Sequence, residues 1–313
     1  AGTFHNMNAN EVVANRAIEI LGGERGNYAL VHPNDHVNMG QSTNDVFPTA
    51  MRLSVLALLK KFYPVAGRLT ETFHQKGIEF DSILKSGRTH LQDAVPIRLG
   101  QEFEAYSKAL FDDIERIRQS QEDLKILGIG GNAVGTGLNT KPGFRQKVVQ
   151  VLSTLTVLEL RNSSNLIEAT QNLNPLAAVS SALRLLALNL IRVANDIRLL
   201  SSGPKTGLAE IILPAVQPGS SMMPGKVNPV MAEVLNMVAF QVMGNDLTVA
   251  LSTLAGQLEL NVMMPVIIHN ILQSLDILTN VFDVFIEKCL VGIKVNQEQC
   301  QRYVEESMGI ATA

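Results

Sequence analysis

The sequence predicts an all-α protein built as an elongated helical bundle, whose central helices form the core of an oligomer. Three observations lead to this prediction. Apolar residues recur at three-, four- or seven-residue spacing, no segment shows sustained two-residue alternation, and several long segments are apolar on more than one side. A helix that is apolar all round is buried in a large core or between subunits. With 313 residues, 46% of them hydrophobic, the chain is long enough for such a core.

Two segments in the first half have one apolar face. Leu53, Leu56 and Leu59 are spaced three residues apart, which is typical of a helix. Proline removes a backbone hydrogen bond within a helix, so Pro64 is expected to break or kink this one. The second face comprises Phe103, Tyr106, Leu110, Ile114, Ile117 and Leu124.

Three later segments, 166–202, 229–252 and 257–291, are long and apolar on several sides. Pro265 is expected to break or kink the last of them. The apolar side chains of the middle segment cannot all face one neighbour: Val234, Leu235, Met237, Val238, Phe240, Val242 and Met243. We therefore expect these helices to be covered by other helices or by copies of the chain.

The most apolar run, near 176–191, is interrupted by Arg184 and followed by Arg192 and Asp196. This pattern favours a buried helix over a membrane span. The net charge of −3 gives no reason to expect nucleic acid or an anionic membrane surface as a partner.

The two cysteines, Cys289 and Cys300, form no C-x-x-C pair and no metal-ligand spacing. Free thiols in a reducing compartment are therefore expected, and with no secretory signal at the start the prediction is a cytoplasmic protein. The chain begins at Ala1 without an initiator methionine and ends at Ala313 without a closing signal, so we expect a fragment.

Four polar connectors rich in glycine and proline separate the helices: 32–48, 86–98, 128–143 and 203–229. They carry nearly all the residues with candidate chemistry. Functional residues are commonly found on loops that a rigid scaffold holds in place.

The most informative connector segment is Gly219–Pro229. Its two glycines are expected to act as hinges, and Asn228 followed by Pro229 predicts an N-cap and the first residue of a helix. The residue after Lys226 is valine and the glycine spacing is too long, so this is not a phosphate-binding P-loop. A mobile loop before a helix N-terminus suits binding of a small carboxylate. Its candidate anion-binding residues are Ser220, Ser221, Lys226 and Asn228.

Two other polar clusters allow a structural and a functional interpretation. Gln41–Asp45 is either a plain N-cap cluster or a cradle for a carboxylate. Within Gly87–Asp93, His90 is either structural or a general acid–base group, which its polar neighbours and its ordinary pKa near neutrality would suit.

Two further patterns are not interpreted as sites. Gly128–Ala133 has the spacing of a dinucleotide fingerprint, but no strand precedes it and no acidic residue follows at the required distance. Gly130, Gly131, Gly135 and Gly137 are expected instead to allow tight turns and close backbone approach. His32 and His36 are four residues apart, yet Pro33 lies between them and no glutamate accompanies them, which argues against a metal site.

The string Gly219–Pro229 resembles the signature loop of the aspartase/fumarase superfamily, G-S-S-x-M-P-x-K-x-N-P, at every fixed position. Three other strips resemble the active-site strips of that family: Thr3 with 6–12, the stretch 32–38 running into 41–45, and 87–96 with 99–103. The resemblance covers essentially the whole chain. It implies that 1–313 is the central helical domain of a lyase, without the additional N-terminal region and the small C-terminal domain of longer family members.

The branch of the superfamily is indicated by smaller features. Thr43, the stretch 168–172 and Val230 resemble the aspartases, whereas 32–38 and Gly130-Gly131 resemble the class II fumarases. Phe4, Asn132 and Met264 differ from both.

The resemblance to the aspartase branch implies the reversible elimination of ammonia from L-aspartate to give fumarate, through a carbanion stabilised as an aci-carboxylate. It implies Ser221 as the base and no cofactor or metal. Thr3, Ser42 and Thr43 would hold the carboxylate that gains charge, and Lys226 and Asn228 the other one. Asn44, Thr89 and His90 would also bind the substrate, with Glu233 orienting His90.

The family also implies a homotetramer in which three subunits share each site. A class II fumarase is the alternative within the superfamily. A catalytically inactive structural or assembly protein on the same scaffold is the alternative of another class.

Overall fold

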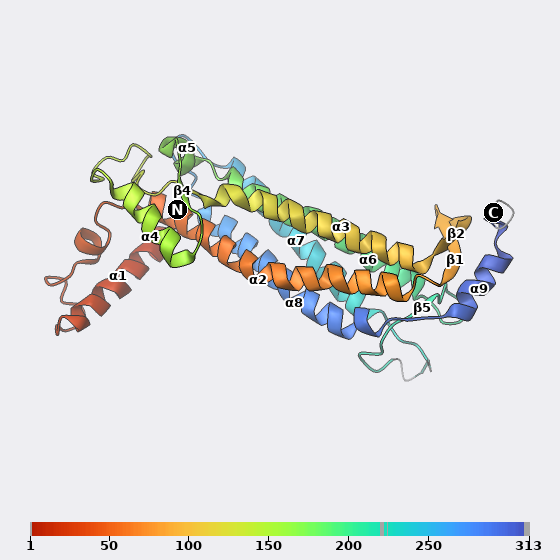
Figure 1. Cartoon of the computed structure of the whole chain (residues 1–313). Coiled ribbons are helices and arrows are strands. Elements are labelled where there is room, and N and C mark those ends of the chain that lie inside the picture. Colours follow the sequence, from red (N-terminus) through yellow and green to blue (C-terminus); the bar gives the residue numbers. More distant parts are fainter. Residues whose placement is uncertain (1, 220–221, 224, 310–313) are drawn as a thin grey trace. The chain divides into compact units, whose positions relative to one another are not determined.

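The computed structural model of the chain describes residues 2–219, 222–223 and 225–309 (Figure 1). The chain divides into two compact units. Unit 1 comprises Ala1–Leu58, Arg118–Ser181 and Asn245–Gln273, and unit 2 comprises Leu59–Ile117, Ala182–Gly244 and Ser274–Ala313. Several long helices contribute residues to both units.

The predicted helical fold is confirmed, because the long elements of the described chain are all helices. In chain order the α-helices are α1 (Thr3–Ile20), α2 (Thr43–Glu79), α3 (Leu99–Ser120), α4 (Phe144–Thr156), α5 (Leu166–Gln171), α6 (Asn174–Leu200), α7 (Val230–Leu254), α8 (Met264–Lys288) and α9 (Gln297–Glu306). Short π and 3-10 turns lie at Pro33–Val37, Gln121–Lys125 and Leu290–Gly292.

The sequence predicts no strands, and the structure differs: the described residues form three small two-stranded sheets. An antiparallel hairpin formed by β1 (Leu84–Thr89) and β2 (Gln92–Arg98) occupies the predicted connector 86–98 and the two residues before it. The other strands are two residues long: β3 (Ile126–Leu127) pairs with β4 (Arg161–Asn162), and β5 (Ile211–Ile212) pairs with β6 (Lys294–Val295). The hairpin lies beside α9 in unit 2 (Figure 1).

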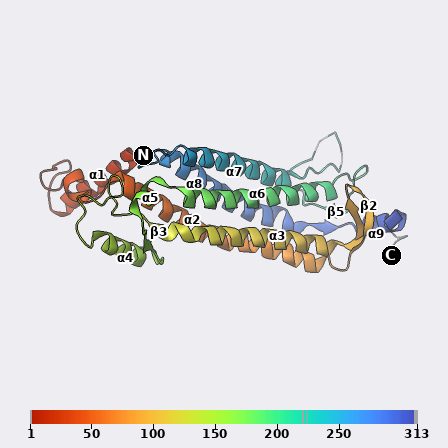
Figure 2. The ribbon, with the colours of Figure 1, turned by 90° about the horizontal axis from the view of Figure 1, so that it is seen from above.

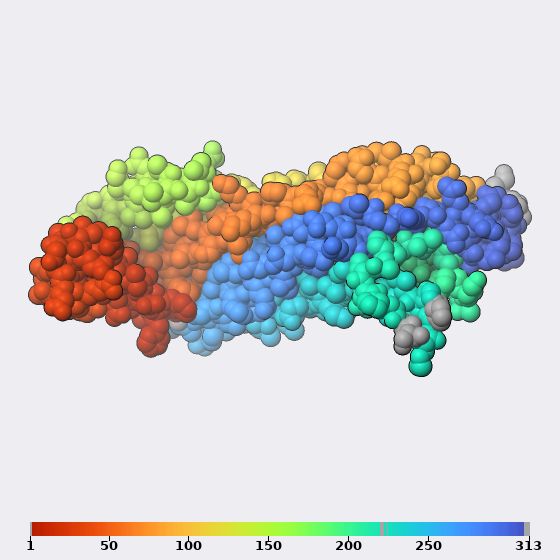
Figure 3. Space-filling view, turned by 90° about the horizontal axis from the view of Figure 1, so that it is seen from below, coloured from red at the N-terminus to blue at the C-terminus, as the bar shows by residue number. Residues whose placement is uncertain are grey.

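The core of unit 2 is rich in aromatic rings. The parts of α2, α3, α6, α7 and α8 that belong to this unit lie side by side (Figure 2). The ring of Phe73 lies between Phe103 and Phe285, with centroids 6.1 and 6.5 Å away, and all three side chains are fully buried. Figure 3 shows α2 and α8 next to each other, where Arg68 of one helix pairs with Asp283 of the other at 2.8 Å.

The core of unit 1 is aliphatic. It takes Met51 and Val55 from α2, Leu176 from α6 and Ile267 from α8, each at most 1% exposed. Spacings of three, four and seven residues place such side chains on one face of a helix, so these are the contacts that the periodicity predicts.

Two predictions about prolines need correction. Pro64 does not break its helix, because α2 is continuous from Thr43 to Glu79. Pro265 is not inside a helix that begins at 257 either. It is the second residue of α8. The N–H groups of the first turn have no acceptor within the helix, so a proline there breaks no helical hydrogen bond.

By length and composition alone, α6 and α7 could each cross a membrane, with 50% and 39% of the relevant windows buried inside the structure. Buried core helices have the same composition. In α6, Leu176, Leu183 and Leu190 recur every seven residues and are at most 1% exposed, so packing within the units accounts for that face.

Candidate active site

The predicted site residues divide between the two units. Unit 1 holds the four at the starts of α1 and α2, namely Thr3, Ser42, Thr43 and Asn44. Unit 2 holds Thr89, His90, Lys226, Asn228 and Glu233. Ser221, the predicted base, and Ser220 lie outside the described residues.

The first group is held together by buried amides. Asn6, one turn after Thr3 in α1, is 7% exposed and its Nδ2 donates to Thr43 Oγ1 at 3.0 Å. Asn10, a turn later, donates to Asn38 Oδ1 at 3.1 Å. These bonds join α1 to the start of α2, so the structure brings the helix turn carrying Thr3 to Thr43. Thr3 itself is exposed.

The interpretation of Gln41–Asp45 as an N-cap is confirmed. Ser42 Oγ accepts the backbone N–H of Asn44 at 3.2 Å, and Asp45 Oδ1 accepts the N–H of Ser42 at 3.1 Å. Both bonds satisfy donors that the first turn of a helix leaves free. Ser42, Thr43 and Asn44 are therefore presented in order at a helix N-terminus, half-buried, where the helix dipole favours an anion.

Asp45 also fastens the glycine-rich connector to this helix start. Its Oδ2 accepts the N–H groups of Gly130 at 3.1 Å and Asn132 at 2.7 Å, and the carboxylate is 1% exposed. Burial raises the pKa of Asp45, while the N–H donors oppose that rise. Asn44 adds a second link, because its Nδ2 donates to the carbonyl of Ala133 at 2.7 Å.

The prediction that these glycines allow tight turns and close backbone approach is confirmed at Gly135 and Gly130. A Cβ on Gly135 would lie 2.4 Å from Ile167 Cα, and Gly130 has a φ of +89°. Asn132, which differs from the family pattern, has a φ of +60° and donates to the carbonyl of Leu138 at 2.9 Å. Asparagine tolerates this left-handed conformation better than most residues, which explains its presence there.

In unit 2, His90 and Leu91 form the two-residue turn of the β1–β2 hairpin. Their φ values are +55° and +61°. Leucine rarely adopts this conformation, which in such turns usually falls to asparagine or glycine, whereas histidine adopts it more often than most residues. Such strain costs about 1–2 kcal/mol per residue and persists where the surroundings determine the backbone. The turn exposes Thr89 and His90 at its tip.

A buried network of four charges lies under this hairpin, and sequence reasoning missed it. Lys85 Nζ contacts Glu102 Oε1 at 2.8 Å and Glu210 Oε2 at 3.1 Å, and Arg88 Nη1 contacts Glu210 Oε1 at 2.9 Å. The side chain of Glu210 is 0% exposed and that of Lys85 2%. Both contacts to Glu210 are ion pairs without the alignment of hydrogen bonds.

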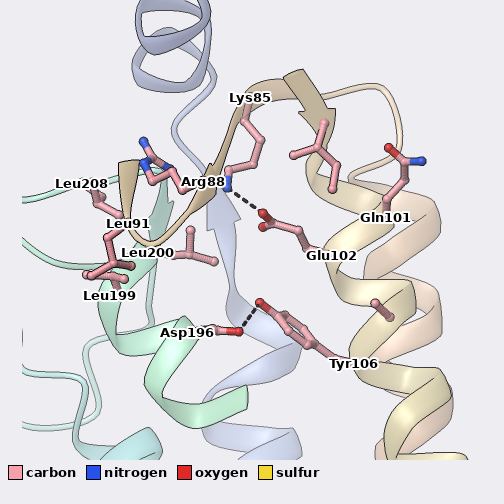
Figure 4. A pocket seen from close by; sticks show the side chains of 12 residues that line it. Lys85, Arg88, Leu91, Gln101, Glu102, Tyr106, Asp196, Leu199, Leu200 and Leu208 are labelled. Atoms are coloured by element: carbon pink, nitrogen blue, oxygen red, sulfur yellow. Dashed lines mark hydrogen bonds and ion pairs between the residues drawn. The ribbon is translucent and has the colours of Figure 1, made fainter. Parts of the chain in front are cut away.

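A cavity of about 300 Å³ opens beside the network (Figure 4). Lys85 and Glu102 line it, together with Tyr106, whose hydroxyl donates to Asp196 Oδ2 at 3.0 Å. Burial raises the pKa of Glu102, opposed by the charge of Lys85, and burial also raises the pKa of Tyr106. The remaining lining is mostly apolar and includes Leu91, the second residue of the strained turn.

The connector before α7 is described only in part. Gly225 has a φ of +81°, as a hinge glycine would, but Gly219 is a close-approach position, where a Cβ would lie 2.0 Å from the carbonyl oxygen of Lys226. Lys226 and Asn228 are exposed. Helix α7 begins at Val230, one residue later than predicted, so Pro229 precedes the helix and its carbonyl accepts the N–H of Glu233 at 3.1 Å.

Within the described ranges no three His, Cys, Asp or Glu residues gather in a way that could hold a metal ion. The arrangement instead offers hydroxyls, amides and helix-terminal N–H groups in unit 1 and an imidazole, a lysine and an amide in unit 2. Such groups can bind carboxylates and an ammonium group and can stabilise developing negative charge.

Comparison with known proteins decides the family. A family model described as lyase matches residues 1–244. The chain belongs to this lyase family. It is a member of the aspartase/fumarase superfamily and is most like the aspartate ammonia-lyases.

The similarity to aspartate ammonia-lyases extends over the whole chain. It is 55% identical to the enzyme from Bacillus subtilis over 313 residues and 50% identical to that from Corynebacterium glutamicum over 312 residues. The chain spans 66% of the first relative's length and 59% of the second's.

Solved structures of the superfamily have the same fold. A fumarate lyase:delta crystallin from Brucella melitensis bound to cobalt is 49% identical with a TM-score of 0.98, and the match covers 100% of this chain and 68% of that one. A class II fumarase from Schistosoma mansoni is 40% identical with a TM-score of 0.93, over 99% of this chain and 68% of the other.

Of the two remaining departures from the family pattern, Phe4 is 93% exposed and Met264 is fully buried in the first turn of α8. Met264 follows a cap in which Asn261 Oδ1 accepts the N–H of Met263 at 2.8 Å. A charged residue at 264 would be enclosed there, which accounts for the methionine.

Proposed function

We propose that this protein is an aspartate ammonia-lyase, a carbon–nitrogen lyase that reversibly converts L-aspartate to fumarate and ammonia. The observation that carries the proposal is the strip Ser42–Asn44, three polar side chains presented at a helix N-terminus that Asp45 caps and clamps. The identity of about 50% to aspartate ammonia-lyases along the whole chain supports the choice of substrate.

The difficult step is removal of a weakly acidic proton from C3 of aspartate. The carbanion becomes accessible when its charge spreads onto the neighbouring carboxylate as an aci-carboxylate. Donors already aimed at those oxygens lower the barrier most. In unit 1 the Ser42 and Thr43 hydroxyls and the α2 N-terminus have this role, and the start of α1 adds Thr3.

The second carboxylate of the substrate would be bound by Lys226 and Asn228. The Asn44 side chain donates to Ala133, so its amide oxygen is the atom that would accept from the substrate's ammonium group. Thr89 and His90 at the exposed hairpin tip would contact the same group, with Glu233 orienting His90. Removal of the proton is assigned to Ser221, activated by Lys226 and the loop N–H groups.

We further propose that the site forms in a homotetramer, where different copies contribute different strips. Both units expose large apolar residues on α7: Met237 and Phe240, 64% and 56% exposed, in unit 2, and Leu247, Leu251 and Leu254 in unit 1. Exposed apolar surface of this kind favours association with copies of the chain. Phe240→Asp should dissociate the assembly in sedimentation, and a stable native monomer would contradict the proposal.

A class II fumarase is the second candidate, since the Schistosoma mansoni fumarase shares 40% identity with the chain. The deciding experiment offers the purified protein aspartate and malate separately and follows fumarate by absorbance and ammonia by a coupled assay. Ammonia and fumarate from aspartate support the proposal. Fumarate from malate alone makes it a fumarase, and no product from either favours an inactive scaffold protein.

The place of action is proposed to be the cytoplasm. Cys289 and Cys300 are buried free thiols, which is compatible with a reducing compartment. Fractionation of the source cells followed by immunodetection tests this.

A further inference from the structure

We propose that Glu210 is a positioning residue for catalysis, which holds the β1–β2 hairpin so that Thr89 and His90 face the substrate. This inference rests on the proposed lyase function for its catalytic consequence. The geometric part, that Glu210 fixes the hairpin, is independent of it.

The carboxylate of Glu210 is the meeting point of two cations from one strand. Lys85 and Arg88 both lie in β1 and contact its two oxygens at 3.1 and 2.9 Å. Glu210 is 0% exposed, so water screens these charges little. Since Arg88 directly precedes Thr89, the ion pair fixes the strand one residue before the proposed substrate contacts.

Glu210 is itself held by main-chain bonds on both sides. Its N–H donates to the carbonyl of Leu200 at the end of α6, at 2.9 Å, and its carbonyl accepts the N–H of Asn296 at 2.9 Å. Cys300 of α9 also donates its thiol to that carbonyl, at 3.7 Å. The backbone of Glu210 is therefore fixed to the helices of unit 2. Its carboxylate, through the ion pairs with Lys85 and Arg88, holds the hairpin against the same helices.

The hairpin requires such an anchor because its turn is strained. His90 and Leu91 both have positive φ values, and two strained residues at an exposed turn relax unless the strands before them are fixed. The register of β1 shifts between Ser86 and Arg88, so the ladder alone determines the end of the strand poorly. Arg88 adds a second contact there, with its guanidinium 5.3 Å from the ring centroid of Tyr303 in α9.

A stabilising role alone does not account for this cluster. A buried ion pair gains little stability over apolar side chains of similar volume, because desolvation offsets the attraction. Two cations of β1 that pair with one fixed carboxylate do, however, fix the position and orientation of that strand relative to Glu210. Glu102 also pairs with Lys85 and lines the cavity beside the hairpin, but among the described residues it forms no ion pair with Arg88 (Figure 4).

The test compares Glu210→Gln with Glu79→Gln in the assembled protein. Glu79 is the control, since it also pairs with a buried lysine of unit 2, Lys76, at 2.8 Å, although its own side chain is 56% exposed. Two quantities are measured: amide hydrogen exchange of the hairpin, and kcat and KM for aspartate. For Glu210→Gln we expect hairpin exchange about tenfold faster, since the variant leaves Arg88 without a carboxylate partner and removes one of the two partners of Lys85. We also expect kcat/KM to fall about 100-fold, with a raised KM, because the substrate contacts are misplaced. Glu79→Gln should change neither.

Unchanged hairpin exchange in folded Glu210→Gln would overturn the inference. So would a lower kcat with the native KM, because that pattern means only fewer folded molecules. If the native protein lacks lyase activity, the proposed function fails, and hairpin exchange alone decides the positioning role. If Glu210→Gln does not fold, Arg88→Lys takes its place: it keeps the charge but loses the planar contact, and it should give the same pattern more weakly.

Discussion

The replacement of Asp45 by asparagine is the sharpest test of how the candidate site is built in unit 1. The carboxylate accepts three backbone N–H groups, from Ser42 at 3.1 Å, Gly130 at 3.1 Å and Asn132 at 2.7 Å. Asparagine has nearly the same shape but only one acceptor oxygen. Its NH₂ group must therefore face at least one of these N–H donors.

The loss of stability expected for each Asp45 variant follows from the hydrogen bonds that it removes. If the amide oxygen takes the place of Oδ2, the bonds to Gly130 and Asn132 remain in neutral form and the bond to Ser42 is lost. A hydrogen bond to a charged acceptor contributes about 1.5–3 kcal/mol, and part of the loss is recovered because a neutral amide is less costly to bury. We expect a decrease of about 2 kcal/mol in the free energy of unfolding for Asp45→Asn and about 4 kcal/mol for Asp45→Ala, which keeps no acceptor.

Urea unfolding of unmodified protein, both variants and Asp35→Asn measures these differences. Asp35 is a suitable control, because its side chain is 69% exposed in the same unit, and its replacement should change stability by no more than about 0.5 kcal/mol. Activity on aspartate should fall in Asp45→Asn as Ser42 and Asn44 lose their alignment. If Asp45→Asn unfolds at the same urea concentration as Asp35→Asn, the carboxylate does not hold the loop and the reasoning fails.

Three further outcomes are expected. Ser221→Ala should lower kcat by several orders of magnitude with little change in substrate affinity. Lys226→Ala should impair both kcat and substrate affinity. If Ser221→Ala keeps near-normal turnover and His90→Ala is inactive, the base is His90. Phe73→Ala, in the aromatic core of unit 2, should lower the free energy of unfolding in urea by about 3–5 kcal/mol. Phe111 is 50% exposed, so Phe111→Ala should lower it far less. Equal losses would contradict the packing described. Burial places the pKa of folded Glu102 above its ordinary value of 4.5, so the folded state binds more protons just above that pH and stability falls as the pH rises. Glu102→Gln removes this titration, so its urea midpoint should fall less than the native one as the pH rises above 4.5, and parallel curves would refute the assignment.

The helices could be predicted because the apolar residues at helical spacing are the ones that the folded protein buries. Leu56 and Leu59 in α2, and Phe103 and Leu110 in α3, are buried as their three-, four- and seven-residue spacings indicate. The polar strip at Ser42 could also be predicted, because capping is a local interaction between residues that are close in sequence.

The hairpin could not be predicted, because β1 and the turn lack the local signals for a strand and a hairpin. Lys85 and Ser86 are both 2% exposed, so polar residues occupy buried positions where alternation would require apolar ones. The turn is formed by His90 and Leu91 instead of the asparagine and glycine that usually mark it. The hairpin is placed by tertiary contacts with α9 and with the charge network, which no local sequence signal shows.

Glu210 could not be recognised for a related reason. In the sequence it is a single acidic residue in a polar connector, and nothing nearby shows that its partners lie more than 120 positions earlier, at Lys85 and Arg88. The same holds for the division of the predicted site residues between the two units, which no sequence pattern reveals. The resemblance to a family assigned roles to Thr89 and His90, but the support of these residues emerged only from the structure.

The two units use buried carboxylates in physically different ways, and this difference makes their roles separable. Asp45 is surrounded by N–H dipoles, which also accept a neutral amide oxygen as a partner, so asparagine retains part of its function. Glu210 faces two full positive charges, and a neutral amide would leave Arg88 without its carboxylate partner and Lys85 with Glu102 alone. Replacement by the matching amide should therefore affect the hairpin in unit 2 more severely than the glycine-rich connector in unit 1, although each change removes a single charge. Support by dipoles tolerates the loss of charge, whereas support by ion pairs depends on it.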